Sequence, residues 1–229
     1  MALRNILLEA SQTDHRLCCQ FLETTPVQSF FKDWFNPDYF VCQSVASPCK
    51  DYCGKAENRC GSAYWRKHCA IVARMMENLA LERGESSNMR KMWHAAGLLH
   101  DLDYLKAPHD QYGRFVGESH PLPLAVMLQD KGFPPFLILA ILEHSPHLEL
   151  SMSSQMSAAL IGCDEAATLA AFGDDLDTIK GVPSAVIAAI PRREVSSLAT
   201  GKRRHNIRER MLAAFDKLNS PKSSFPVFS

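Results

Sequence analysis

The sequence predicts an all-α protein, built as a helical bundle with an extension at each end. Apolar side chains between residues 63 and 172 recur every three to four positions, as on one face of a helix, and no strand-like alternation interrupts them. Ser, Gly and Pro residues stand where helices would begin and end. With 46% hydrophobic and 22% charged residues in a chain of 229, the composition suits a sizeable packed core.

We divide the chain into an N-terminal extension over residues 1–62, a helical domain over residues 63–172 and a C-terminal extension over residues 173–229. The N-terminal extension contains a cysteine-rich loop whose thiols have a spacing that matches no common zinc module. These thiols are Cys42, Cys49, Cys53 and Cys60. We interpret them as reduced, with a structural zinc or cluster site as the alternative. The C-terminal extension is predicted to hold a basic helix near residues 203–218, with a solvated face, and a loose tail.

The first two helices of the central domain follow from the residues at their ends. Residues 63–84 carry one broad apolar face, and Gly84 suits the left-handed conformation that ends a helix. Residues 86–105 are predicted to form the next helix, with Ser86 or Ser87 as its N-cap. This second helix runs from a polar cap through an apolar stretch into the sequence HDLD.

Three more helices complete the predicted bundle, and prolines mark two of them. Ser119 is predicted to cap a helix that runs to Lys131, with prolines in its first turn, where a missing N–H is tolerated. Residues 134–146 begin and end with proline, and residues 153–172 form the last helix. The ends of these helices therefore define short connections, as in a compact bundle.

The charge pattern bears on partners and location. The formal net charge is zero, although residues 181–229 hold nine Lys and Arg against three Asp and Glu. Because the chain is neutral overall and its basic residues are not interleaved with aromatic ones, we expect no nucleic-acid partner. No apolar run reaches the roughly 18 residues of a membrane span, so we expect a cytoplasmic protein without a membrane partner. The oligomeric state is not indicated.

Six histidines and aspartates fall on successive predicted helices, mostly at helix ends. They are His68, His100, Asp101, His120, His144 and Asp164. Helix ends meet at one end of a bundle, which is where bundles build metal sites. Neutral imidazole and carboxylate suit Fe, Mn, Zn, Ni or Mg, and Asp101 is well placed to bridge two ions. The alternative for His120 and His144 is a purely local role, as a helix cap and as a partner of the helix dipole.

This pattern resembles the HD superfamily, named for its adjacent His-Asp pair. The family pattern of an early His, the doublet and a late Asp falls here on His68, His100–Asp101 and Asp164, and the surrounding GLLHDLDY is similar to that of bacterial predicted hydrolases. The resemblance covers residues 63–172 and implies an HD-domain helical bundle. His120 and His144 resemble the further ligands of the two-metal branch, so two divalent ions are implied.

The sequence departs from the family beyond the doublet, which leaves the substrate open. Leu102-Asp103 stands where many relatives have Ile-Gly, and Tyr104 stands where some carry a Lys or a further His. The resemblance implies hydrolysis of a phosphate ester or phosphoanhydride of a small molecule or nucleotide by a metal-activated water. Asp101 and Asp103 are the catalytic candidates, Asp103 either as a base or as the anchor of a ligand histidine. Candidate substrate contacts are Arg66, Lys67, Lys106, His109 and Arg114.

Two alternatives to a phosphohydrolase remain at this point. A small branch of the superfamily holds two irons and uses oxygen to cleave C–C or C–P bonds, and the same ligand types serve iron. The second alternative is a metal-bound ligand sensor without enzymatic activity. Metal analysis after anaerobic purification separates these readings.

Overall fold

The computed structural model describes residues 62–103, 120–190 and 201–221, with side chains described from residue 67 in the first range and from residue 204 in the last. Within these ranges the regular structure consists of helices, which confirms the predicted all-α class. The cysteine-rich loop lies outside the described residues, as do residues 104–119 and most of the predicted tail.

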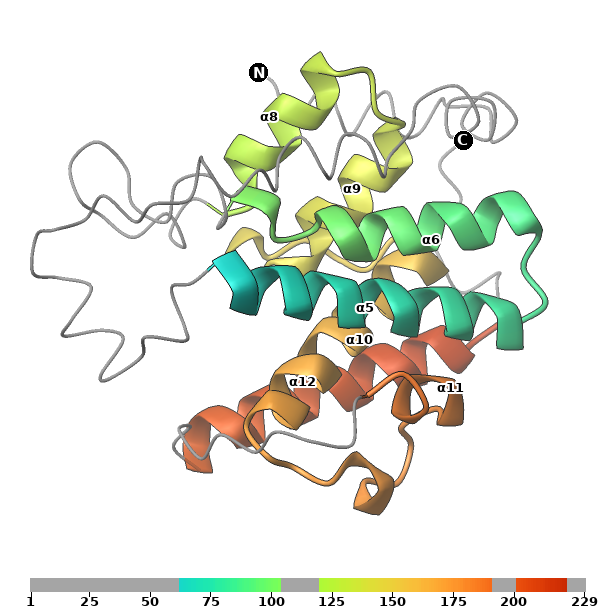
Figure 1. The fold of residues 1–229 in the computed structure, drawn as a ribbon, viewed down its shortest axis with the longest axis vertical. Coiled ribbons are helices and arrows are strands. Elements are labelled where there is room, and N and C mark those ends of the chain that lie inside the picture. The colour runs from blue at the N-terminus through green and yellow to red at the C-terminus, as the bar shows by residue number, and fades with distance from the viewer. Residues whose placement is uncertain (1–61, 104–119, 191–200, 222–229) are drawn as a thin grey trace, which may run out of the picture.

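The helices form one bundle around a central pair. Two long helices, α5 and α6, run side by side, with α8 and α9 on one side of them and α10, α11 and α12 on the other (Figure 1). The α-helices are α5 (Ser62–Glu82), α6 (Ser87–Leu99), α8 (Leu122–Asp130), α9 (Pro135–His144), α10 (Gln155–Ala171), α11 (Ser184–Ile187) and α12 (Gly201–Asn219). Two short 3₁₀ turns, η3 (Pro146–Leu148) and η4 (Leu176–Thr178), follow α9 and α10. Among the described helices, none combines the length and apolar character needed to cross a bilayer.

The hydrophobic core extends from the central pair into the C-terminal helix. Met76 on α5, Trp93 on α6 and Ile141 on α9 are fully buried in it. Phe215 of α12 belongs to the same cluster, and it packs where Gly162 of α10 has no side chain to obstruct the ring. The basic C-terminal helix is therefore a component of the same core as the helices that carry the candidate ligands.

The predicted boundary between α5 and α6 is confirmed. Gly84 has a φ of 72°, the left-handed conformation that glycine adopts without strain after a helix. The hydroxyl of Ser86 then accepts a hydrogen bond from the backbone N–H of Met89 at 3.3 Å, as an N-cap does. These two features fix the turn that lets α6 return along α5.

The second helix is shorter than the sequence predicts. It ends at Leu99, with His100 as its C-cap, whereas the apolar pattern predicts helix to residue 105. The ring Nδ1 of His100 donates to the carbonyl oxygen of Gly97 at 2.8 Å, which satisfies one of the carbonyls left without a partner at a helix end. Asp101 follows in a turn, so the His-Asp doublet lies just beyond the helix rather than within its last turn.

The start of α8 also differs from the prediction. Its N-cap is Pro121, not Ser119, and the helix begins at Leu122. Proline has no N–H and a fixed φ, so it is readily placed at a helix start. The two remaining helices of the domain match their predicted positions, and Ser154 caps α10 through the N–H of Ser157 at 3.0 Å.

Gly97 sets the distance between α5 and α6, and its replacement is expected to disturb both packing and site. A Cβ at this position would lie 2.6 Å from Cα and 2.7 Å from N of Ala73 on α5. Because backbone cannot yield as a flexible side chain can, Gly97→Ala is expected to lower the free energy of unfolding by about 1–3 kcal/mol, measured by urea denaturation. The same shift separates His68 from His100, so metal affinity falls as well.

The matched control is Gly84→Ala, where a Cβ would meet nothing within 4 Å but the φ is positive. This variant is expected to lose about 1 kcal/mol for backbone reasons alone, and to keep the metal affinity of the wild type. Equal metal affinity of Gly97→Ala and Gly84→Ala would show that the helix crossing does not control the site.

Candidate metal centre

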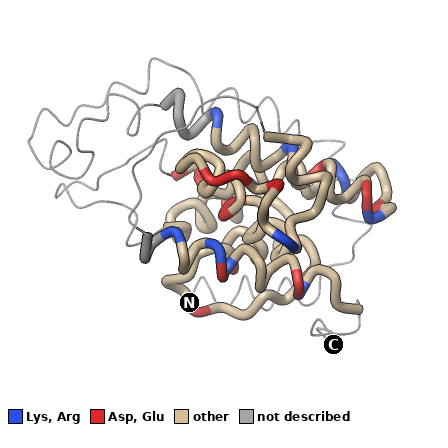
Figure 2. Tube along the Cα trace, turned by 90° about the horizontal axis from the view of Figure 1, so that it is seen from below, with Lys and Arg blue, Asp and Glu red and all other residues tan. Residues whose placement is uncertain are grey.

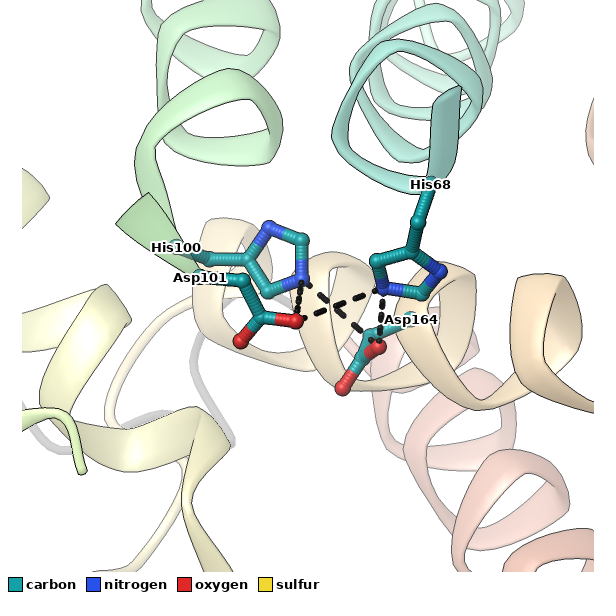
Figure 3. Close-up of side chains that lie close together, drawn as sticks. All are labelled: His68, His100, Asp101 and Asp164. Atoms are coloured by element: carbon teal, nitrogen blue, oxygen red, sulfur yellow. Dashed lines mark hydrogen bonds and ion pairs between the residues drawn. The ribbon is translucent and has the colours of Figure 1, made fainter. Parts of the chain in front are cut away.

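Four of the predicted ligands converge from three helices. Nε2 of His68 on α5 lies 3.0 Å from Oδ1 of Asp164 on α10 and 3.5 Å from Oδ2 of Asp101. Nε2 of His100, at the end of α6, lies 3.3 Å from Oδ2 of Asp101 and 3.6 Å from Oδ1 of Asp164 (Figure 3). All four donor atoms lie within 4.8 Å of one another, which makes this group a candidate metal site.

A second group shares Asp101 with the first. Its other oxygen, Oδ1, lies 3.2 Å from Nε2 of His120 and 3.6 Å from Nε2 of His144. The two imidazole nitrogens are 2.9 Å apart. The carboxylate of Asp101 therefore presents one oxygen to each group, which is the arrangement of a carboxylate that bridges two ions. The structure thus brings the six predicted ligands into two adjoining groups.

Three of the imidazoles are held in place through Nδ1, which leaves Nε2 facing the cluster. His100 donates to the carbonyl of Gly97 and His144 to that of Ile141, in both cases three residues earlier at the end of a helix. The third, His120, donates to Oδ1 of Asp103 at 2.8 Å. Partners of this kind fix the ring orientation and tautomer of metal-binding histidines. The anchor role predicted for Asp103 matches this contact.

The donor set fits a cation. Nε2 of His120 and Nε2 of His144 lie 2.9 Å apart, so without a metal one of them must carry a proton, and a bound cation would take the place of that proton. Nε2 of His100 is fully buried and faces carboxylate oxygens of Asp101 and Asp164 at 3.3 and 3.6 Å. Donors about 2.1 Å from one ion lie about 3.0–3.4 Å from one another, close to the separations found in both groups.

The cluster shifts the pKa values of its members in opposite directions. Burial favours the neutral form of Asp101, but the charges and hydrogen bonds of the surrounding histidines outweigh it and hold the pKa well below the usual range. The pKa of Asp164 is lowered in the same way by His100 and His68. Burial opposes protonation of His120, yet Asp101 and Asp103 raise its pKa to about 9. The pKa of His100 is raised well above its ordinary value for the same reason, by Asp101 and Asp164.

The metal-free protein is therefore expected to be most stable in mildly acidic solution. Because the pKa of His120 is raised, protonated His120 stabilises the fold fully at a pH below 6.5, the ordinary pKa of histidine. This stabilisation is lost as the pH rises to about 9, which lowers the free energy of unfolding by roughly 3 kcal/mol. The lowered pKa values of Asp101 and Asp164 stabilise the fold above 3.8, and that contribution is lost at lower pH. His144, whose pKa is lowered by burial, has the opposite sign to His120.

Urea denaturation of chelator-treated protein between pH 4 and 9 measures this dependence. The free energy of unfolding is expected to decline from pH 6.5 to 9, and bound metal is expected to flatten the decline because it replaces the proton at the imidazoles. A metal-free protein as stable at pH 9 as at pH 6 would contradict the electrostatic account.

The predicted substrate contacts are mostly outside the described part of the chain. Lys67 precedes His68 on α5 and its side chain is exposed. The other candidates are Arg66, whose side chain is not described, and Lys106, His109 and Arg114, which fall in residues 104–119. All five stay predictions. Lys and Arg lie at separate positions along several helices (Figure 2), and the expected absence of a nucleic-acid partner is likewise still a prediction.

Sequence reasoning missed the ion pairs made by the basic helix. Its face is predicted to be solvated, but Arg204 pairs with Asp174 at 3.2 Å and Arg210 pairs with the buried Glu165. A further buried acid, Glu143 beside His144, accepts the backbone N–H of Ser153 at 3.0 Å, and burial raises its pKa. The sequence does carry a signal for these buried acids, because each is the immediate neighbour of a candidate ligand, as in Glu143-His144 and Asp164-Glu165.

The fold and the cluster together define a class of protein: a helical bundle that gathers histidine and aspartate donors from several of its helices. The HD domain family model matches residues 65–218, more than half of the chain. The chain belongs to the HD domain family, which confirms the resemblance found in the sequence and includes α12 in the match. The family implies metal-dependent phosphohydrolase-type activity at the superfamily level. Searches of curated proteins and of solved structures found no match.

Proposed function

We propose that this protein is a metal-dependent hydrolase that acts on a phosphate ester or phosphoanhydride of a small molecule or nucleotide. The observation that carries the proposal is the position of Asp101 between two groups of donors, with Oδ2 toward His68 and His100 and Oδ1 toward His120 and His144. Such a set suits two divalent ions about 3.5–4 Å apart, as in two-metal hydrolases.

Each residue of the cluster has a role in this proposal. His68, His100 and Asp164 hold one ion, His120 and His144 hold the other, and Asp101 holds both. A pair of divalent ions supplies a water of lowered pKa and positive charge for phosphoryl oxygens. Asp103 keeps Nδ1 of its partner histidine protonated and Nε2 directed at the cluster.

The uneven number of donors indicates where a substrate would bind. One group offers four protein donors and the other offers three, counting Asp101 in both. Catalytic sites characteristically combine three protein ligands with an open position, whereas closed sites are filled by protein. We therefore assign the open positions for water and a phosphoryl oxygen to the side of His120 and His144. The proposed phosphate contacts are Arg66 and Lys67, beside the group of His68, and Lys106, His109 and Arg114.

The test combines metal analysis with turnover. Protein purified anaerobically is analysed for bound metals, and then assayed against p-nitrophenyl phosphate, bis(p-nitrophenyl) phosphate and a panel of nucleotides, with each of Mn, Mg, Zn, Ni and Fe. We expect two metal equivalents and metal-dependent phosphate release. The control variant is His94→Ala, which removes a histidine that is not part of the cluster. His94 lies on α6 and pairs with Glu77 at 3.0 Å on the outside of the bundle.

The alternatives predict different results in the same experiment. Two redox-active irons with turnover that requires oxygen would replace the hydrolase by the oxygenase. Bound metal with neither phosphate release nor oxygen consumption would favour the sensor. A wild-type protein without metal would overturn the proposal altogether.

A further inference from the structure

One arginine of the C-terminal helix joins two segments that carry candidate ligands. Nη1 of Arg210 on α12 makes an ion pair with Oε1 of Glu165 on α10, and its Nη2 donates to the backbone carbonyl of His144 at 2.9 Å. Glu165 directly follows Asp164, and its side chain is 8% exposed. A single guanidinium thus contacts the neighbour of a candidate ligand in one group and the backbone of a candidate ligand in the other.

The backbone carbonyl of His144 needs a hydrogen-bond donor from outside its own helix. His144 is the last residue of α9, so its C=O has no partner within the helix, and the negative end of the helix dipole favours a cation there. The same residue is anchored through Nδ1 to the carbonyl of Ile141. The ring of His144 is thus held through Nδ1, and Arg210 holds its backbone carbonyl.

A second arginine on the same helix makes chemically equivalent contacts away from the site. Nη1 of Arg204 pairs with Asp174 at 3.2 Å, and Nη2 donates to the carbonyl of Phe172 at 2.6 Å, at the C-terminal end of α10. Both arginines are about one third exposed. They differ in that Arg204 holds the end of a helix that carries no ligand there, whereas Arg210 holds the ligand residue His144 itself.

We propose that Arg210 is a positioning residue of the metal centre, through which α12 sets the place of His144 relative to Asp164. The inference rests on the proposed function, since it requires two bound ions. The partners of Arg210 are Glu165 and the backbone carbonyl of His144, and neither is a donor atom of the cluster. It acts on the ion held by His120 and His144, because His144 is the ligand whose backbone it fixes.

The test is a stepwise Co²⁺ titration of the metal-free full-length chain, followed by visible absorption, for wild type, Arg210→Met, Arg210→Lys and Arg204→Met. In Arg210→Met we expect the equivalent assigned to His144 to bind about 10–100-fold more weakly, the range for loss of contacts that orient ligands. The other equivalent is expected to change less than about threefold. Arg210→Lys is expected to lie between, because an ammonium cannot form the two parallel contacts of a guanidinium.

Arg204→Met controls for stability. Both methionine variants are expected to lower the urea midpoint, but only Arg210→Met changes the affinity for Co²⁺. Wild-type binding of both equivalents by Arg210→Met, or equal weakening in Arg204→Met, would overturn the inference. If Arg210→Met does not fold, Arg210→Lys decides, and wild-type affinity in it overturns the inference. A wild-type chain that takes up one ion contradicts the two-ion centre, and one that takes up none contradicts the proposed function itself.

Discussion

Replacing Asp101 with alanine is expected to remove both metal ions and to abolish turnover. Each oxygen of this carboxylate lies 3.2–3.6 Å from the imidazoles of one donor group, so the substitution removes a ligand from both groups at once. It also removes the only carboxylate of the group that contains His120 and His144. Metal content by mass spectrometry and phosphate release measure the two losses in one preparation.

Two companion variants make this result specific. Asp101→Asn keeps the shape but offers a single acceptor oxygen and no charge, so at most one ion should remain bound. Asp103→Ala is expected to be milder, with a loss of about 10–100-fold in affinity or activity, because Asp103 orients His120 instead of holding an ion. Full metal content and turnover in Asp101→Ala, with both lost in Asp103→Ala, would show that the wrong aspartate is assigned to the bridge.

The second large effect is expected in His144→Ala, which should lose one metal equivalent and nearly all turnover. His144 belongs to the group with three donors, so its removal leaves only two protein ligands there. The four donors around His68 are untouched and should keep their ion. His68→Ala is the complementary variant, in which the other equivalent is expected to be lost.

These two variants also test whether the site is dinuclear. Each single variant should retain about one equivalent, and the double variant should retain none. If His144→Ala and His120→Ala both keep the full metal content of the wild type, the two-ion centre is wrong and a mononuclear hydrolase remains. If each single variant does retain one equivalent, its cobalt spectrum assigns the remaining absorption band to one donor group.

Much of the fold could be predicted because helix ends carry local chemical signals. Gly84 and Ser86 act within a few residues of their own positions, so the turn between α5 and α6 follows from sequence alone. The grouping of His68, His100 and Asp164 could be predicted because their order along the chain resembles the family pattern of an early His, the doublet and a late Asp. The structure confirms the class of fold and brings these residues together.

Contacts between distant segments could not be predicted in this way. The turn at His100 and Asp101 interrupts the predicted helix, which resumes at Leu102, and the ring of His100 donates there to the carbonyl of Gly97. The packing of α12 depends on the fit of Phe215 against Gly162, more than fifty residues apart. The charge pattern of α12 predicts that Arg210 is solvated, because it contains no information about Glu165, its partner on another helix.

The sequence separation of 96 positions between His68 and Asp164 has a consequence for biosynthesis. A ribosome releases the chain from its N-terminus, so His68, His100 and Asp101 emerge while α10 has yet to be made. During that interval the nascent chain offers an incomplete donor set, and Arg210 follows later still. The group of Asp101, His120 and His144 is complete in sequence before α10 has been made, whereas the group that includes Asp164 is complete only once α10 has emerged. The two halves of the centre therefore become available at different times, and the Arg210 contacts come last.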